Sequence, residues 1–249
     1  GLHGFPETIL RGPHHVCACC CWYTFRMRIT TLAACFFLGT SSMCVATDAD
    51  RATILRDVSA LHTGGNPASM VVWGEATPLA AMGDGRVLAA SAAFGKGRVV
   101  VVGHGGYLET TEADSEVFAA NAIEWLGARV TSPVRVAGLS EVIAAELTRR
   151  GVAFTRVEGG IKKIDLAQVD VVVGSPQAWT KAGREEELKA WLAGGGGALF
   201  AETAWGVLQL NKDLTIDTLA ANRLLEPMGV RFDSHANSPE GKNKAYPID

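Results

Sequence analysis

The regular alternation of short apolar runs with amphipathic stretches is the feature of this sequence that most constrains its fold. Residues 98–102 form a β-branched run that is wholly apolar after its first residue, which is typical of a strand buried on both faces. Residues 115–127 instead place Phe118, Trp125 and other apolar side chains at helical spacing. Strands that alternate with helices in this way predict a parallel sheet with helices on both faces.

The same alternation continues through most of the chain. It predicts further strands at 70–73, 86–93, 134–137, 152–157, 169–173, 198–201 and 230–232, and further helices at 51–62, 140–150, 181–193 and 216–228. We therefore expect one three-layer α/β domain over residues 47–233, with a mostly parallel sheet. The polar stretch 234–249 contains Pro239, Gly241 and Pro247, and we interpret it as a linker toward a further C-terminal domain that lies beyond this chain.

Composition excludes two classes of protein. Hydrophobic residues make up 48% of the chain, which is enough to bury a core, so an intrinsically disordered protein is excluded. The formal net charge is only -3, which argues against a broad surface for nucleic acids or for a membrane. No nucleic-acid partner is therefore expected.

All six cysteines lie at or before position 44, which separates the front of the chain from the predicted domain. A short basic segment at 27–31 is followed by an apolar run at 32–38 and by small residues at 44–46. This order is typical of a secretory signal peptide, which we place at residues 27–46. The apolar run is too short for a transmembrane helix, which needs about 20 residues. We therefore expect no transmembrane span and an extracytoplasmic location, either periplasmic or secreted.

Other interpretations of the front of the chain stay open. Residues 1–26 begin without a methionine, and we interpret them as a non-native leader, with a genuine N-terminal extension as the alternative. Leu32-Ala33-Ala34-Cys35 resembles a lipoprotein cleavage box, so lipidation is the alternative to free secretion. The potential ligands in His14-His15-Val16-Cys17-Ala18-Cys19 are too crowded for paired zinc knuckles, and we predict no metal there.

The first candidate site is Gly103-His104-Gly105-Gly106, directly after the predicted strand 98–102. Ligands of open α/β sheets bind beyond the carboxyl ends of strands, so His104 and Gly105 are candidate ligand-binding residues. The stretch lacks the third glycine of a dinucleotide fingerprint, and the chain lacks the Gly-x-Ser-x-Gly elbow of esterases. The alternative is a tight turn that needs glycine dihedral angles, with His104 packing or capping.

The second candidate site is Glu202-Thr203-Ala204-Trp205-Gly206, which follows the predicted strand 198–201. In many three-layer hydrolases such a strand-to-helix corner carries the nucleophile, but this one contains neither Cys nor Ser. Thr203 is a weak nucleophile without a nearby base. We retain Glu202 and Trp205 as candidate ligand-binding residues, with packing as the alternative for Trp205.

No catalytic residue, metal site or cofactor is predicted. The histidines after residue 46 are His62, His104 and His235, and none belongs to a His-Glu-x-x-His motif. The run Gly194-Gly195-Gly196-Gly197 precedes a strand rather than a helix, which favours a helix-to-strand connection over a phosphate-binding loop.

Two stretches carry a resemblance to a known family. One is Phe94-Gly95-Lys96-Gly97-Arg98-Val99-Val100-Val101-Val102-Gly103-His104-Gly105-Gly106-Tyr107-Leu108, followed by Asn121-Ala122-Ile123-Glu124-Trp125-Leu126. The other is Leu192-Ala193-Gly194-Gly195-Gly196-Gly197-Ala198-Leu199-Phe200-Ala201-Glu202-Thr203-Ala204-Trp205. In order and spacing both resemble the N-terminal region of the TRP-channel-associated factor family and its bacterial relatives, over roughly residues 65–249. Those relatives carry an enhancin-like zinc metallopeptidase domain further along the chain.

The resemblance implies a class I glutamine amidotransferase-like, flavodoxin-like module that is not the catalytic part of its parent protein. The nucleophilic cysteine of true amidotransferases is absent, since no cysteine follows position 44, and no family catalytic residue can be transferred to this chain. We expect an accessory module of a secreted, glycoprotein-targeting zinc metallopeptidase, with the parent's own peptidase domain and a glycan or glycoprotein as partners. The alternatives are a cryptic hydrolase that uses His104 with Thr203 or Glu202, and a pure interaction or glycan-binding module.

Overall fold

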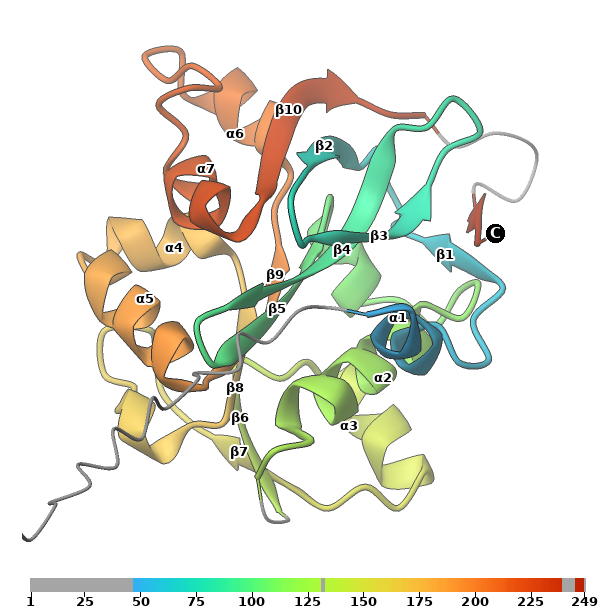
Figure 1. The fold of residues 1–249 in the computed structure, drawn as a ribbon, viewed down its shortest axis with the longest axis vertical. Helices are drawn as coiled ribbons and strands as arrows, with labels where there is room; N and C mark the ends of the chain where they lie inside the picture. Colours follow the sequence, from blue (N-terminus) through green and yellow to red (C-terminus); the bar gives the residue numbers. More distant parts are fainter. Residues whose placement is uncertain (1–46, 131–132, 239–244, 249) are drawn as a thin grey trace, which may run out of the picture. The chain divides into compact units, whose positions relative to one another are not determined.

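The computed structural model describes residues 47–130, 133–238 and 245–248, and within them a nine-stranded sheet forms the centre (Figure 1). Its strands are β2 (Ala68–Val72), β3 (Thr77–Ala81), β4 (Val87–Phe94), β5 (Gly97–Val102), β6 (Val134–Ala137), β7 (Phe154–Val157), β8 (Val171–Gly174), β9 (Gly197–Ala201) and β10 (Val230–Ala236). The strand order is β10-β2-β4-β5-β9-β8-β6-β7, and β3 pairs with β4. A separate two-stranded sheet joins β1 (Ala60–His62) to β11 (Ala245–Pro247).

Only part of the large sheet is parallel. β5, β9, β8, β6 and β7 pair in parallel, whereas β10, β2, β3 and β4 pair antiparallel, and β4 is antiparallel to β5. The prediction of a mostly parallel sheet is therefore wrong for the second group of strands. Short turns join β3 to β4 and β4 to β5, with Gly85 and Gly95 at positive φ, and a tight turn can only connect antiparallel strands.

Strand β5 lies inside the sheet and is buried on both faces, as the sequence predicts. Val99 and Val101 belong to one core cluster, and Val100 and Val102 belong to the other. This alternation follows from the two-residue side-chain period of a strand. The two clusters are the two interfaces between the sheet and its helices.

Helices cover both faces of the sheet (Figure 1). They are α1 (Asp48–Ile54), α2 (Ser115–Gly127), α3 (Glu141–Arg149), α4 (Pro176–Lys181), α5 (Glu185–Gly194), α6 (Ala204–Leu210) and α7 (Ala220–Leu225), with short 3-10 turns η1 (Gly105–Leu108), η2 (Leu166–Gln168) and η3 (Glu226–Met228). Buried residues of α1, α2 and α3 belong to one core cluster, and those of α4, α5, α6 and α7 to the other. The α/β architecture with helices on both faces agrees with the prediction.

Several helices differ from their predicted bounds. The predicted helix 51–62 begins instead at Asp48, where Thr47 caps it, and ends at Ile54. Asp57 then adopts a positive φ of 60°, and the chain continues into β1, so the apolar period through Leu61 belongs to two elements. The predicted helix 181–193 is preceded by the separate helix α4, and the predicted helix 216–228 begins only at Ala220.

The C-terminal stretch carries two strand segments that the sequence does not predict. β10 continues to Ala236, and β11 pairs with β1 in the register Leu61–Tyr246. Asn237 is fully buried, and its side-chain amide donates to the carbonyl of Pro67 at 3.0 Å. The expected loop over 234–249 is therefore wrong at 234–236 and 245–247.

The predicted leader at 1–26 and the predicted signal peptide at 27–46 lie outside the described residues. None of the helices formed by the described residues is both long and apolar enough to span a membrane.

Candidate functional site: the carboxyl edge of the parallel strands

Three polar side chains follow three neighbouring parallel strands at their carboxyl ends. His104 comes two residues after β5, Glu202 directly follows β9, and Ser175 directly follows β8. Val102 is the register partner of Ala201, and Phe200 is the partner of Gly174, so the three strands end at the same edge. The structure thus places both candidate sites at the edge where open α/β sheets bind ligands.

His104 caps the short turn η1. Its Nδ1 atom accepts a hydrogen bond from the backbone N–H of Gly106 at 2.8 Å. The ring also lies against Gly65, where a Cβ atom would come within 2.9 Å of Nε2. Burial lowers the pKa of His104 despite the opposing charge of Glu109, which favours the neutral imidazole that can accept at Nδ1. Packing and capping are the alternative role that the sequence allows for this histidine, and the structure shows both contacts.

Close backbone approach, rather than dihedral angle, explains two of the glycines in this segment. A Cβ atom on Gly103 would lie 1.9 Å from the carbonyl oxygen of Ala68, and one on Gly106 would lie 1.7 Å from that of Thr63. Neither glycine is among the described residues with positive φ, so the expectation of special glycine dihedrals is wrong here. Gly105 has open space around its Cβ position, and nothing in its surroundings requires a glycine.

Glu202 is buried at the end of β9, with 7% of its surface exposed. It accepts a hydrogen bond from Ser175 Oγ at 2.5 Å and further bonds from the backbone N–H groups of Gln177 and Thr203. Burial raises the pKa of Glu202, although these bonds and the charge of Lys181 oppose the rise. The carboxylate thus fastens the end of β9 to the start of α4.

Trp205 and Thr203 do not form a catalytic pair with His104. The Trp205 indole N–H donates to the carbonyl of Asn66 at 2.9 Å, and its ring packs against the core cluster under α4 to α7. Thr203 occupies the N-cap position of α6 without a side-chain capping bond. Among the described residues no hydrogen bond joins His104 to Glu202 or to Thr203, and no group of three His, Cys, Asp or Glu side chains could hold a metal ion.

The loop between β1 and β2 connects the two candidate sites. Its Gly65 contacts the His104 ring, and the adjacent Asn66 accepts the bond from Trp205. The polar atoms at this edge therefore hold backbone segments in place around the strand ends. These contacts make the surface at the strand ends rigid.

Sequence reasoning missed Ser175. The available signal was Ser175-Pro176 after an apolar run, because serine is favoured at the N-cap and proline at the first helical position. In the structure Ser175 Oγ accepts from the backbone N–H of Ala178 at 3.2 Å while it donates to Glu202.

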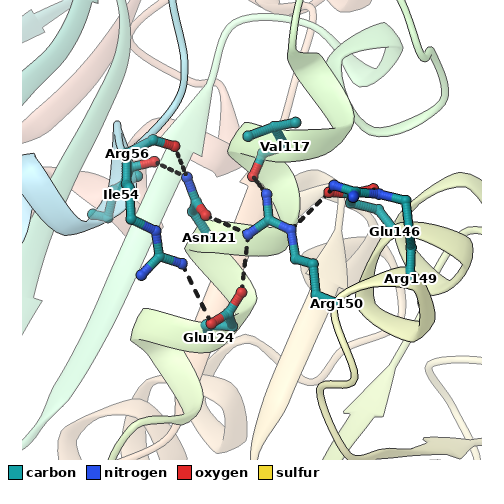
Figure 2. A network of polar contacts seen from close by, with 8 residues as sticks. All are labelled: Ile54, Arg56, Val117, Asn121, Glu124, Glu146, Arg149 and Arg150. Atoms are coloured by element: carbon teal, nitrogen blue, oxygen red, sulfur yellow. Dashed lines mark hydrogen bonds and ion pairs between the residues drawn. The ribbon is translucent and has the colours of Figure 1, made fainter.

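A partly buried polar network ties α1, α2 and α3 together on the face of the sheet that these helices cover (Figure 2). The Asn121 amide donates to the carbonyls of Ile54 at 3.0 Å and of Arg56 at 2.7 Å. Its oxygen accepts from Arg150 Nη1 at 2.6 Å, and the same nitrogen bonds Glu124 at 3.0 Å. Figure 2 shows these side chains converging from the end of α1, from α2 and from the end of α3.

Glu146 completes this network. Arg149 and Arg150 each donate to its carboxylate at 2.7 Å. The hydrogen bonds from Arg149 and then from Arg150 lower the pKa of Glu146 to about 2, against the effect of burial. A cavity of about 320 Å³ opens beside the network, and its lining includes Arg56 and Glu124. The arginines here already have carboxylate partners, so the network is a structural clamp.

Comparison with known proteins gives the family. The family model described as "TRPM8, N-terminal domain" (TCAF_N) matches residues 31–246. A TRPM8 channel-associated factor homolog of Danio rerio is 27% identical over 209 residues, which is 82% of this chain and 21% of that protein. TRPM8 channel-associated factor 1 of Bos taurus is 31% identical over 168 residues, or 67% of this chain and 17% of that protein. The chain thus spans about a fifth of the length of these relatives.

Solved structures with a similar fold come from a bacterial metallopeptidase. IMPa from Pseudomonas aeruginosa in complex with an O-glycopeptide superimposes with a TM-score of 0.55 at 16% identity, over 80% of this chain and 23% of that one. IMPa in complex with T-antigen gives a TM-score of 0.52 at 17% identity. At this identity the likeness shows a shared fold. Because the family model covers most of the sequence, the chain belongs to the TCAF N-terminal domain family.

Proposed function

We propose that this chain is a non-catalytic accessory module of a larger, extracytoplasmic, enhancin-like zinc metallopeptidase that acts on glycoproteins. The family match and the fold shared with IMPa support this proposal, as does the chain's coverage of only about a fifth of its relatives. We further infer that the fold is a variant of the class I glutamine amidotransferase-like, flavodoxin-like class. In this variant an antiparallel extension follows β5 along the sheet.

The observation that carries the proposal is that the polar side chains at the carboxyl ends of β5 and β9 are engaged in hydrogen bonds within the protein. His104 Nδ1 is occupied by the N–H of Gly106, and Glu202 is occupied by Ser175 and two backbone N–H groups. A nucleophile needs a base within hydrogen-bond reach, and the described residues at this edge do not provide such a pair to Thr203. The edge is therefore suited to support a partner domain or a bound glycan.

The test separates an accessory module from a hydrolase. The purified chain is assayed with an O-glycopeptide and with panels of esters, amides and glycosides, beside the variants His104→Ala and Glu202→Gln. We expect no turnover by the wild-type chain. Turnover that both variants abolish would overturn the proposal and favour a hydrolase that uses His104 with Glu202 or Thr203.

A binding assay tests the glycan part of the proposal. Fluorescence anisotropy compares an O-glycopeptide with the same peptide lacking its sugar. We expect the chain to bind the glycosylated form more tightly. Equal affinity for both forms would remove the glycan as a partner of this module and leave the peptidase domain as its proposed partner.

A further inference from the structure

A cavity of about 600 Å³ lies between loop 160–163 and the second half of α4, and neither His104 nor Glu202 lines it. Its apolar surface comes from Ile161, Ala178 and Ala182, and its polar groups are three exposed lysines, Lys162, Lys163 and Lys181. No carboxylate is among the residues that line it. The cavity therefore combines an apolar floor with a cluster of positive charge.

The wall formed by loop 160–163 is held in place by the surrounding structure. The Arg184 guanidinium donates to the carbonyl of Ile161 and stacks over the Trp179 ring, 5.3 Å from its centroid. The backbone N–H of Lys163 bonds the carbonyl of Gly160 at 2.8 Å, and the next residue, Ile164, is buried in the core. The opposite wall is the helix α4 itself. A ligand would thus meet a largely preformed site, which reduces the cost of binding.

Among the residues that the structure describes, none forms an ion pair with any of the three lysines, although the charge of Lys181 acts on the buried Glu202. The cavity beside Arg149 and Arg150 is different, because Glu124 and Glu146 neutralise its arginines. In a chain with a net charge of -3, three clustered lysines around one cavity are a local departure from the overall charge.

We propose that this cavity binds a small phosphate or sulfate monoester, with the oxyanion held by Lys162, Lys163 and Lys181 and the organic part resting on Ile161 and Ala178. A lysine ammonium is a compact point charge with three N–H donors, and it binds the oxygens of phosphate and sulfate groups as such. The apolar floor adds contact with the body of the ester. This proposal does not rest on the proposed accessory role.

Calorimetry on the whole chain tests the site with four probes. Phenyl phosphate tests the combination of oxyanion and apolar body, and inorganic phosphate tests the oxyanion alone. Glucose 6-phosphate represents phosphorylated metabolites, and N-acetylglucosamine 6-sulfate represents sulfated glycans. We expect phenyl phosphate to bind more tightly than inorganic phosphate, and the stronger of the two sugar esters to identify the source of the ligand.

Matched variants locate the binding. Lys163→Gln and Lys181→Gln should each weaken ester binding about tenfold through the loss of one charged contact. Ala178→Leu should remove ester binding by filling the cavity from the helix. Lys212→Gln removes an exposed lysine elsewhere and should leave the affinity unchanged. Unchanged melting temperatures would show that the variants fold.

Four results would overturn the proposal. The first is that no ester binds at millimolar concentration, and the second is that Lys212→Gln loses as much affinity as Lys163→Gln and Lys181→Gln. The third is that only inorganic phosphate binds and that Ala178→Leu does not affect this binding. The fourth is lysine-dependent binding to anionic phospholipid vesicles without binding of any ester. The last result would assign the cluster to a membrane surface instead.

Discussion

The Ser175 hydroxyl donates a hydrogen bond of 2.5 Å to the buried carboxylate of Glu202 and so joins the ends of the neighbouring strands β8 and β9. Burial raises the pKa of Glu202 above its ordinary value of 4.5. The folded protein therefore holds the proton of this carboxyl group more tightly than the unfolded chain does. This relationship links the stability of the folded protein to pH.

Glu202→Gln should reduce the pH dependence of stability. Because the folded pKa is raised, the stabilisation from Glu202 is fully present below about pH 4.5 and is lost as the pH rises through the folded pKa. The glutamine variant has no carboxyl group to titrate, so its free energy of unfolding should fall less than that of the wild type from pH 4 to pH 7. Urea unfolding at several pH values measures this difference.

Glu75→Gln is the control for this prediction, because Glu75 is an exposed carboxylate in the turn between β2 and β3. Its variant should keep the wild-type pH dependence. A Glu202→Gln protein with the full wild-type dependence would show that the raised pKa does not act on stability.

Gly106→Ala should destabilise the protein, whereas Gly105→Ala should not. The new methyl group at position 106 would lie 1.7 Å from the carbonyl oxygen of Thr63 and 2.8 Å from His104 Nδ1, while position 105 is open. Overpacking against backbone costs about 1–3 kcal/mol or more. Thermal melting of the two adjacent variants measures the contrast, and equal melting temperatures would contradict the close approach.

Glu146→Gln should destabilise the protein at neutral pH and have a smaller effect in acid. Arg149 and then Arg150 lower the pKa of Glu146 to about 2, so its stabilisation is present above the unfolded value of 4.5 and is lost as the pH falls toward 2. We expect a loss of about 1–3 kcal/mol at pH 7. Denaturant unfolding at pH 7 and pH 3 should show a shrinking difference from wild type, and an equal difference at both would argue against the ion pair.

Asn121→Ala should weaken the attachment of α1 to α2 (Figure 2). The change leaves the buried carbonyl of Ile54 and the partly buried carbonyl of Arg56 without their donor and deprives Arg150 of an acceptor. Unsatisfied buried groups of this kind cost about 1–3 kcal/mol each, so we expect a total loss of about 2–4 kcal/mol. Gln209→Ala, an exposed change in α6, is the matched control. Hydrogen exchange at the α1 amides should accelerate in Asn121→Ala alone.

The elements with strong local signals could be predicted from the sequence. Helix α2 has the predicted bounds 115–127, β6 has the predicted bounds 134–137, and α3 begins after the predicted cap Ser140. In each case the apolar period agrees with the packing, and a cap or a glycine marks an end. Gly229, with a φ of 78°, marks such an end before β10.

The antiparallel direction of β3, β4 and β5 follows from two short turns between consecutive strands. The turns at Gly83-Asp84-Gly85 and Gly95-Lys96-Gly97 are hairpin signals, and these local signals outweigh the general alternation that suggested a parallel sheet. The antiparallel strand β3 is not among the predicted strands. It contains Pro78 and, among the described strands, pairs only with β4, which agrees with the confinement of proline to the edges of sheets. β11 is short and is stabilised by its pairing with β1, which lies far away in sequence.

In the candidate sites, too, the local features could be predicted and the contacts between distant segments could not. Their place beyond β5 and β9 followed from the strand pattern, whereas the partners of their side chains did not. Ser175 meets Glu202 and Asn66 meets Trp205 only because distant segments fold together. The three lysines at the cavity likewise come from distant segments, because strand β8 and most of α4 separate Lys163 from Lys181 in the sequence.

The pairing of β10 with β2 delays the completion of the sheet during synthesis of the protein. A ribosome releases β2 early, but the partner of Val72 is Val230, which leaves the ribosome only after 158 further residues. Until then β2 presents an unpaired edge on which another nascent chain can add a strand. β2 therefore stays open to strand addition until the segment that contains β10 has been made.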